Sequence, residues 1–359
     1  MPPSSPPAVV IRPARPAEVT ALRALVAAVD ASTPYLPREP GEWPVWCGGS
    51  DPAAALARFQ ARPNAVVLVA EAGGGLAGWL GATGGGLPAT RGTITLALGV
   101  AEGWRGRGVG SALLTAARRW AESVGAWRLD LSVVTGNTGA AALYRRHGFH
   151  HEGTLRATAR VAVMMQDEHI LARLLRDPGP VWEPVDAPPA PGGSWGTVTV
   201  RPAEPADAAA YGRFRHAMAR ETPFLLHPPT DGAPCPPPAG PGIVTFAAIS
   251  QGEVLGAAVV VRGTLARTHH DAAVRLSVRR TAWGNGVGQR LLAAATAWAQ
   301  AEGVMRLSAW TPVHNRRGRR FAAAAGFAEE AVCTAALRLG GRAAGRVLLG
   351  ALTGAMPHQ

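Results

Sequence analysis

Apolar residues in the first half of the chain recur with two periods, which predict two kinds of element. Alternating or continuous apolar segments predict strands near residues 8–12, 65–71, 76–82, 93–100, 127–134, 149–156 and 159–171. Apolar residues spaced three and four apart predict helices over Ala17–Asp30, Gly108–Ser123 and Thr138–His147. Because strands alternate with helices in the middle and run in pairs at the ends, the pattern predicts a mixed α/β sheet with helices on its faces.

The second half of the chain repeats the first. Ile11–Glu18 is similar to Val200–Asp207, and Val100–Phe149 aligns without a gap on Val278–Phe327 with 17 identical residues in 50. A repeat of this length predicts two copies of one folding unit. Between the copies, dense proline and glycine disfavour helix and central strand. We therefore expect a first domain over 1–176, a linker over 177–196 and a second domain over 197–359.

Composition and charge exclude several classes of function. All 36 basic residues among the 359 are arginine, which excludes chemistry that needs a lysine, such as a Walker phosphate loop or a pyridoxal phosphate Schiff base. The three cysteines and ten histidines lack the spacing of a disulfide framework or a metal site, so we expect no metal. The net charge of +12 accompanies no nucleic-acid motif and no apolar run long enough to span a membrane. We expect a cytoplasmic protein with neither a nucleic-acid nor a membrane partner.

A glycine-rich turn follows the predicted strand 93–100 and leads directly into a predicted helix. The turn reads Ala101-Glu-Gly-Trp-Arg-Gly-Arg-Gly-Val-Gly-Ser111. Glycines let backbone N–H groups converge on one point, and a helix N-terminus adds positive potential, so a pyrophosphate can bind there. Arg105 and Arg107 add positive charge. The spacing G-x-G-x-G after a fourth strand differs from the Rossmann fingerprint, which follows a first strand.

A second motif follows the next predicted strand. It runs from Asn137 to Phe149 as N-x-x-A-x-x-L-Y-x-x-x-G-F, and the glycine turn contains R-x-x-G-x-G from Arg105 to Gly110. Together they resemble the GNAT superfamily of acetyl-CoA-dependent N-acetyltransferases. The resemblance covers residues 8 to about 175 and, in weaker form, 197 to about 352. It implies two tandem GNAT folds, each a mixed, splayed central β-sheet flanked by helices.

The resemblance implies acetyl-CoA as the co-substrate. Backbone amides of Gly106–Ser111, with Arg105, would cradle the pyrophosphate, and the pantetheine arm would run along Leu98–Val100. A backbone N–H near Leu98 or Gly99 would polarise the acetyl carbonyl, and Tyr144 would protonate the leaving thiolate. The implied cofactor-binding residues are Leu98, Gly99, Val100, Arg105, Gly106, Arg107, Gly108, Val109, Gly110, Ser111, Asn137 and Tyr144.

The resemblance identifies the general base and the acceptor pocket less directly than the cofactor site. The strand 93–100 lacks the carboxylate that many relatives carry there, which leaves the base open between Glu102, Glu152 and Asp167. We take Glu102 as the catalytic candidate. Tyr35 and Trp43 stand where the family binds its acceptor and would line that pocket. The alternative is that these two aromatic residues only cover one end of the sheet.

The second copy departs from the motifs at the reactive positions. It keeps the glycines of the turn, but Trp283 replaces Arg105 and Ala322 replaces Tyr144. We therefore predict a catalytically silent second lobe, while the first lobe transfers acetyl to a primary amine of a small molecule or a protein by direct attack. The alternative is a non-catalytic acyl-CoA-binding or scaffold protein. If the two lobes pair as GNAT subunits do in dimers, the protein is a monomer with pseudo-dimeric lobes.

Overall fold

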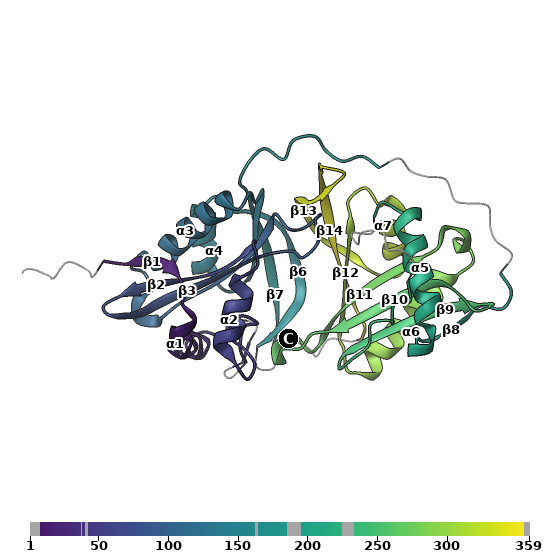
Figure 1. The fold of residues 1–359 in the computed structure, drawn as a ribbon, viewed down its shortest axis with the longest axis horizontal. Helices are drawn as coiled ribbons and strands as arrows, with labels where there is room; N and C mark the ends of the chain where they lie inside the picture. The colour runs from purple at the N-terminus through teal and green to yellow at the C-terminus, as the bar shows by residue number, and fades with distance from the viewer. Residues whose placement is uncertain are drawn as a thin grey trace, which may run out of the picture. The chain divides into compact units, whose positions relative to one another are not determined.

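The computed structural model describes residues 8–36, 38–39, 42–161, 164–184, 195–224 and 233–354. The centre of the predicted linker, residues 185–194, lies outside these ranges. The chain divides into two compact units (Figure 1). The first comprises residues 1–154, 161–180 and 335–338, and the second comprises 155–160, 181–334 and 339–359.

Seven strands among the described residues form the sheet of the first unit. They are β1 (Val10–Pro13), β2 (Ala65–Ala72), β3 (Gly75–Gly84), β4 (Thr93–Val100), β5 (Arg128–Val134), β6 (His150–Val161) and β7 (Met164–Leu174). Residues 155–160 of β6 are counted with the second unit. Their order across the sheet is β1-β2-β3-β4-β5-β7-β6, so β7 lies between β5 and β6. Strands β4 and β5 are parallel, whereas β1–β2, β2–β3, β3–β4 and β5–β7 are antiparallel. The sheet is therefore mixed, as the sequence predicts.

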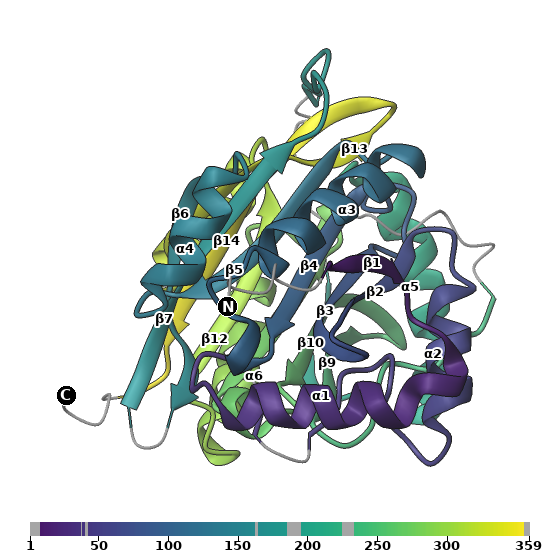
Figure 2. The same ribbon diagram turned by 90° about the vertical axis from the view of Figure 1, so that its left-hand side faces the viewer.

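Helices cover both faces of this sheet. Helices α3 (Val109–Ser123) and α4 (Thr138–Arg146) contribute to one apolar cluster, and α1 (Val19–Ala31) and α2 (Pro52–Gln60) contribute to another. Figures 1 and 2 show α3 and α1 on opposite sides of the strands.

Two details of the first unit differ from the sequence prediction. The pattern does not predict α2, although Asp51 caps this helix by accepting a hydrogen bond from the Ala54 N–H at 2.9 Å, and Pro52 stands in its first turn. The pattern also starts the last strand at residue 159, whereas β6 continues to Val161. The sequence around residue 160 contains no glycine or proline, so it carries no local signal that one strand ends and another begins.

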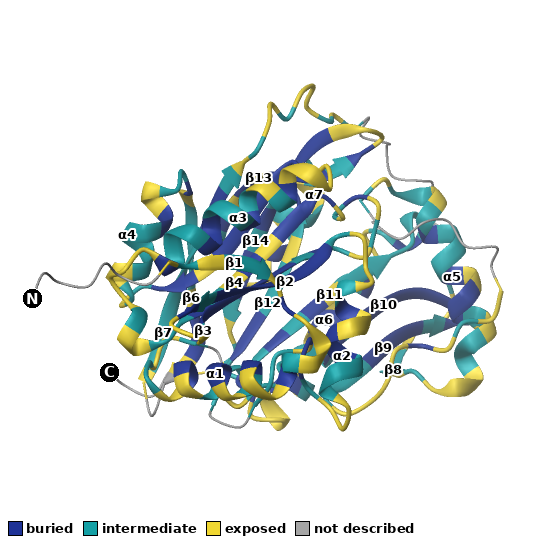
Figure 3. Cartoon of the chain, turned by 60° about the vertical axis from the view of Figure 1, so that its left-hand side comes forward, coloured by how far each residue is buried: buried dark blue, intermediate teal, exposed yellow. Residues whose placement is uncertain are grey.

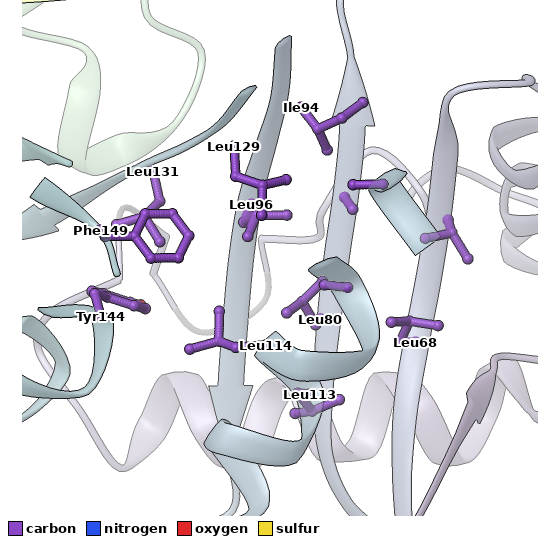
Figure 4. Close-up of a cluster of buried hydrophobic side chains, with 14 of the residues drawn as sticks. Leu68, Leu80, Ile94, Leu96, Leu113, Leu114, Leu129, Leu131, Tyr144 and Phe149 are labelled. Carbon is purple, nitrogen blue, oxygen red and sulfur yellow. The ribbon is translucent and has the colours of Figure 1, made fainter. Parts of the chain in front are cut away.

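The core of the first unit follows the alternation of side chains along its strands. Ile94 and Leu96 of β4 and Leu129, Leu131 and Val133 of β5 are buried against α3 and α4. Figure 4 shows Ile94, Leu96, Leu129 and Leu131 of this set, with Tyr144 and Phe149 at one side of the cluster. Figure 3 shows buried residues along the central strands. The alternate residues of β4 and β5 therefore point to the opposite face of the sheet.

The second unit repeats this architecture. Its strands are β8 (Thr199–Pro202), β9 (Ile243–Ser250), β10 (Glu253–Arg262), β11 (Asp271–Val278), β12 (Arg306–Pro312), β13 (Ala328–Leu339) and β14 (Arg342–Leu352). Their order is β13-β14-β12-β11-β10-β9-β8, with the same neighbours as in the first unit. Its helices are α5 (Ala208–Glu221), α6 (Val287–Ala301) and α7 (Arg316–Ala324). In the part of the chain that the structure describes, no helix is both long and apolar enough to cross a membrane.

Candidate functional site

The parallel strands β4 and β5 pair over only part of their length. Their register holds three Cα pairs, from Thr93↔Arg128 to Thr95↔Asp130, although the strands run on to Val100 and Val134. Beyond Thr95, the other edge of β4 stays paired with β3. Main-chain groups of β4 that face the split lie outside the β4–β5 ladder, so they can pair with an extended ligand as with another strand. The structure confirms the splayed sheet that the sequence resemblance implies.

The turn after β4 presents backbone rather than side chains. It passes through the 3₁₀ turn Glu102–Trp104 and ends at Gly108, the N-cap of α3. Gly106 and Gly108 have φ values of 72° and 82°, and the position that a Cβ would take on either glycine is open space. Successive amides in such a turn, with the N-terminus of α3, form a concave donor surface for an anion. A turn of this form can bind an anion, and the binding of a pyrophosphate here stays a prediction.

The Arg105 side chain is held by two other segments of the first unit. Its Nε donates to the Val100 carbonyl at 3.2 Å, its Nη1 donates to the Ser32 carbonyl at 3.4 Å, and its Nη2 donates to Ser32 Oγ. Ser32 is the C-cap of α1. Arg105 therefore connects the glycine turn to the end of β4 and to the start of the predicted acceptor segment, a connection that the sequence analysis did not predict.

Asn137 begins the second motif, and Tyr144 lies in the middle of it. Tyr144 is buried on α4, with its ring centroid 6.0 Å from that of Phe149 (Figure 4). Burial raises the pKa of the Tyr144 phenol above its ordinary value of 10.0, which keeps the phenol protonated and able to donate. Asn137 is the N-cap of α4, where its side chain accepts a hydrogen bond from the Ala140 N–H at 3.2 Å. This capping accounts for asparagine at this position, and its contact with the cofactor stays a prediction.

The residues predicted beside the reactive centre lie in different environments. Glu102 is exposed in the 3₁₀ turn that follows β4. Tyr35 is 36% exposed, and its Cε1 lies 3.4 Å from the position of a Cβ on Gly136, just beyond the end of β5. The guanidinium of Arg23 lies 3.9 Å from the centroid of the Trp43 ring. Of the two predicted acceptor residues, the structure therefore places Tyr35 by the end of β5.

Several residues of β4 and α3 that the sequence predicts to bind the cofactor are packed in the interior of the unit. Gly99 is buried by Val29 of α1 and by the Trp79 indole, because Val29 Cγ1 lies 2.7 Å and Trp79 Nε1 lies 2.8 Å from the position of a Cβ on this glycine. Val109 is 1% exposed and belongs to the core. A Cβ on Gly110 would lie 3.0 Å from Leu143 Cδ2, so glycine allows α3 and α4 to approach closely. At these positions only the backbone is suited to contact a ligand.

The face of the sheet opposite α3 and α4 carries polar side chains beside the split. Thr95 Oγ1 donates to Asp130 Oδ1 at 2.7 Å, across the last β4–β5 pair. Ser132 is exposed, and its Oγ donates to Glu168 Oε1 on β7 at 3.1 Å. No motif in the sequence marks these residues. Alternation along 127–134 could have placed Asp130 and Ser132 on one face, but no sequence signal brings Glu168 beside them.

The structure separates the other two candidates for the general base. Glu152 forms a bidentate ion pair with Arg128, in which Nη1–Oε1 is 2.9 Å and Nη2–Oε2 is 2.5 Å. Because both carboxylate oxygens accept hydrogen bonds from a fully buried guanidinium, Glu152 has a structural role. Asp167 precedes Glu168 on β7, so its side chain points to the opposite face, the one that carries α3 and α4.

The second unit keeps the backbone of the site and changes its side chains. Strands β11 and β12 also form three parallel pairs, from Asp271↔Arg306 to Ala273↔Ser308, and then part. Gly284 and Gly286 have φ values of 84° and 72°. Trp283 Nε1 donates to the Val278 carbonyl at 2.9 Å, the bond that Arg105 makes in the first unit. Ala322 stands at the position of Tyr144 and provides no proton donor.

Comparisons with known proteins agree with this geometry. The sequence profile of the acetyltransferase (GNAT) family matches residues 35–149 and, a second time, residues 214–327. No curated protein matched the chain.

Solved structures similar to this chain include three acetyltransferases. A GNAT-family acetyltransferase from Streptococcus pneumoniae has 26% identity and a TM-score of 0.44, covering 46% of this chain and 99% of its own. An acetyltransferase from Salmonella typhimurium with its cofactor acetyl-CoA has 20% identity and a TM-score of 0.42, covering 47% and 95%. A phosphinothricin acetyltransferase from Sinorhizobium meliloti in complex with AcCoA has 19% identity and a TM-score of 0.40, covering 46% and 88%. Because the family profile matches well over half of the 359 residues, this chain belongs to the GNAT acetyltransferase family, as a tandem member whose co-substrate is acetyl-CoA.

Proposed function

We propose that the first unit is an N-acetyltransferase, in which a primary amine attacks the thioester of acetyl-CoA directly. The observation that carries the proposal is the split between β4 and β5, with a glycine turn at one end and a buried tyrosine on α4. In this arrangement β4 pairs with the pantetheine arm beyond Thr95, and the turn binds the pyrophosphate. The acceptor is the amine of a small molecule or of a protein.

Each group in the first unit has a defined part in this reaction. A backbone N–H near Leu98 or Gly99 polarises the acetyl carbonyl and stabilises the oxyanion that forms on attack. Tyr144 protonates the departing thiolate, because its buried phenol retains its proton at neutral pH. Tyr35 contacts the acceptor beside the end of β5. No covalent enzyme intermediate is required.

The second unit takes no part in the chemistry. It retains the split and the left-handed glycines, but Ala322 and Trp283 replace the proton donor and the arginine of the turn. The competing function is a non-catalytic acyl-CoA-binding or scaffold protein, which the retained backbone of this unit favours.

A screen of primary amines separates the two functions. The full chain is incubated with acetyl-CoA and a panel of small amines and amine-bearing peptides, and the release of thiol is measured together with the acetylated product. We expect release of CoA that depends on one class of amine and yields an equal amount of N-acetyl product. Acetyl-CoA binding by calorimetry without transfer to any amine would instead identify a binding protein.

The two glycine turns allow a matched test of where acetyl-CoA binds. Gly108→Ala places a Cβ on a residue with φ of 82°, which costs about 1–2 kcal/mol in the left-handed region and turns the amides of the loop away. We expect acetyl-CoA to bind about tenfold more weakly, the equivalent of roughly 1.4 kcal/mol. Gly286→Ala imposes the same strain in the second unit and leaves the affinity unchanged. Calorimetry of both variants measures the difference, and weakening by Gly286→Ala rather than by Gly108→Ala would place acetyl-CoA in the second unit.

A further inference from the structure

A hydroxyl and a carboxylate from neighbouring strands border the split between β4 and β5. Thr95 pairs with Asp130 in the parallel ladder, so two residues further along Ser132 is level with Ala97. Glu168 of β7 pairs with Val134, which by the same count is level with Gly99. The hydrogen bond from Ser132 Oγ to Glu168 Oε1 therefore lies at the level of β4 where the proposed function places the acetyl carbonyl.

Comparing matching positions of the two units shows which carboxylates occur in both units and which occur only in the first. The pair Arg128–Glu152 recurs in the second unit as Arg306–Glu330, in which Nη2 contacts Oε2. By contrast, Arg346 stands at the position of Glu168. Like Tyr144, Glu168 is therefore replaced by a different residue in the second unit, whereas the position of Glu152 keeps a glutamate.

Asp130 also lacks a counterpart in the second unit, where Ser308 replaces it, but it is less suited to take a proton from an amine. It is 5% exposed, accepts the hydrogen bond of Thr95, and has its Oδ2 3.5 Å from Arg128 Nε. It also stands at the closed end of the split, where the ladder is intact.

We propose that Glu168, positioned by Ser132, is the proton acceptor for the attacking amine. This inference rests on the proposed function. The ammonium group of the acceptor passes one proton to Glu168, and the neutral nitrogen then attacks the acetyl carbon. The C–N bond forms, the C–S bond breaks, and the thiolate takes a proton from Tyr144. The remaining excess proton on nitrogen restores Tyr144, and Glu168 releases its proton to solvent.

The charged groups around Glu168 are compatible with this role. Those that share its face of the sheet are Asp130 and Arg128 on β5, Glu152 on β6, and the pair of Asp30 on α1 with Arg38, whose guanidinium lies 5.5 Å from the centroid of the Trp79 ring. Both cations are engaged by carboxylates, because Arg128 donates two hydrogen bonds to Glu152 and Arg38 donates two to Asp30. Carboxylates thus predominate beside the split in a chain of net charge +12, and they attract a cationic amine.

The test is the pH dependence of kcat/KM for the acceptor that the amine screen identifies. Glu168→Gln is expected to lower kcat/KM about 10²-fold at neutral pH, the size of a typical general-base contribution. The loss should shrink as pH rises toward about 10, because an aliphatic amine then deprotonates without help. Acetyl-CoA affinity, measured by calorimetry, should match that of the wild type and show that the fold and cofactor site are intact.

Ser132 is a positioning residue, and its variants test that part. Ser132→Ala removes the hydrogen bond to Glu168 and should give a weaker version of the same pH-dependent loss. Ser132→Thr keeps a hydroxyl and should restore most of the activity. A structural effect alone would lower the rate equally at every pH.

The possible outcomes separate this inference from the proposed function. If the wild type transfers acetyl to no amine, both fail. If the wild type is active and Glu168→Gln keeps its rate and pH profile, only the assignment of Glu168 fails. The assignment also fails if Glu102→Gln or Asp167→Asn, rather than Glu168→Gln, produces the loss that high pH relieves.

Discussion

Replacing Tyr144 with phenylalanine lowers kcat about 10²-fold, with little change in the KM for acetyl-CoA, if the phenol protonates the leaving thiolate. The substitution removes one oxygen and keeps the ring, so the contact with Phe149 and the packing of the core persist. The loss therefore falls on the transition state rather than on binding or folding. Steady-state kinetics and the thermal midpoint of the variant measure the two effects separately.

The second unit contains a matched control for this substitution. Tyr211 is also buried, with its ring centroid 6.0 Å from that of Phe214, and burial raises the pKa of its phenol as well. Tyr211→Phe should leave kcat unchanged because it lies outside the reactive site. The role of Tyr144 as proton donor is wrong if Tyr144→Phe stays within about threefold of the wild type, since general acids contribute at least about 10²-fold.

The pKa of Tyr144 also predicts the alkaline side of the pH profile. A buried phenol titrates above its ordinary pKa of 10.0 because burial disfavours the charged phenolate. The neutral, donating form therefore persists as pH rises through that value. We expect kcat of the wild type to show no decline from loss of this proton below pH 10. A decline centred well below this pH, and absent from Tyr144→Phe, would contradict the burial of the phenol.

Replacing Arg128 with methionine should destabilise the first unit by about 3–5 kcal/mol, the usual cost of removing one partner from a buried ion pair. The Arg128 side chain is fully buried, and both of its terminal nitrogens donate hydrogen bonds to Glu152. The Glu152 side chain is 11% exposed. Asp130 lies 3.5 Å from its Nε. Without the guanidinium, the carboxylates of Glu152 and Asp130 remain largely buried and lose the cation that neutralises them.

Urea unfolding of the full chain measures this cost, with an exposed pair as the control. Arg118→Met removes the i,i+4 pair with Glu122 on the surface of α3, where such pairs contribute about 0.3–0.5 kcal/mol. The double variant Arg128→Met, Glu152→Gln should recover part of the loss, since it removes an unpaired carboxylate. If Arg128→Met destabilises no more than Arg118→Met, the buried pair does not hold the strands together.

Much of the architecture could be predicted because it depends on local patterns. The strand at residues 93–100 is found where its alternation predicts it, and β5 begins within one residue of its predicted start. The glycine turn was visible because only glycine adopts a left-handed backbone at little cost, as at Gly106 and Gly108. The split between β4 and β5 was expected only through the resemblance to a family, since no local pattern encodes where a ladder ends.

Less of the candidate site than of the fold could be predicted from the sequence. Tyr144 could be named because it belongs to a contiguous motif. Ser132 and Glu168 are 36 residues apart, and Arg105 and Ser32 are 73 residues apart, and no motif joins either pair. The motifs therefore indicate only carboxylates near them as the general base, namely Glu102, Glu152 and Asp167.

The duplication, the kinds of element and the replacement of Tyr144 and Arg105 in the second copy can therefore be read from the residues alone. These features are readable because backbone periodicity and residue identity act over a few neighbouring positions. The position of β7 between β5 and β6 is known only from the folded chain, and it places Glu168 beside Ser132, while the long side chain of Arg128 reaches Glu152 across β7. Alternation shows that a side chain shares a face with its second neighbour along the strand, but which strands become adjacent depends on long-range pairing across the whole sheet.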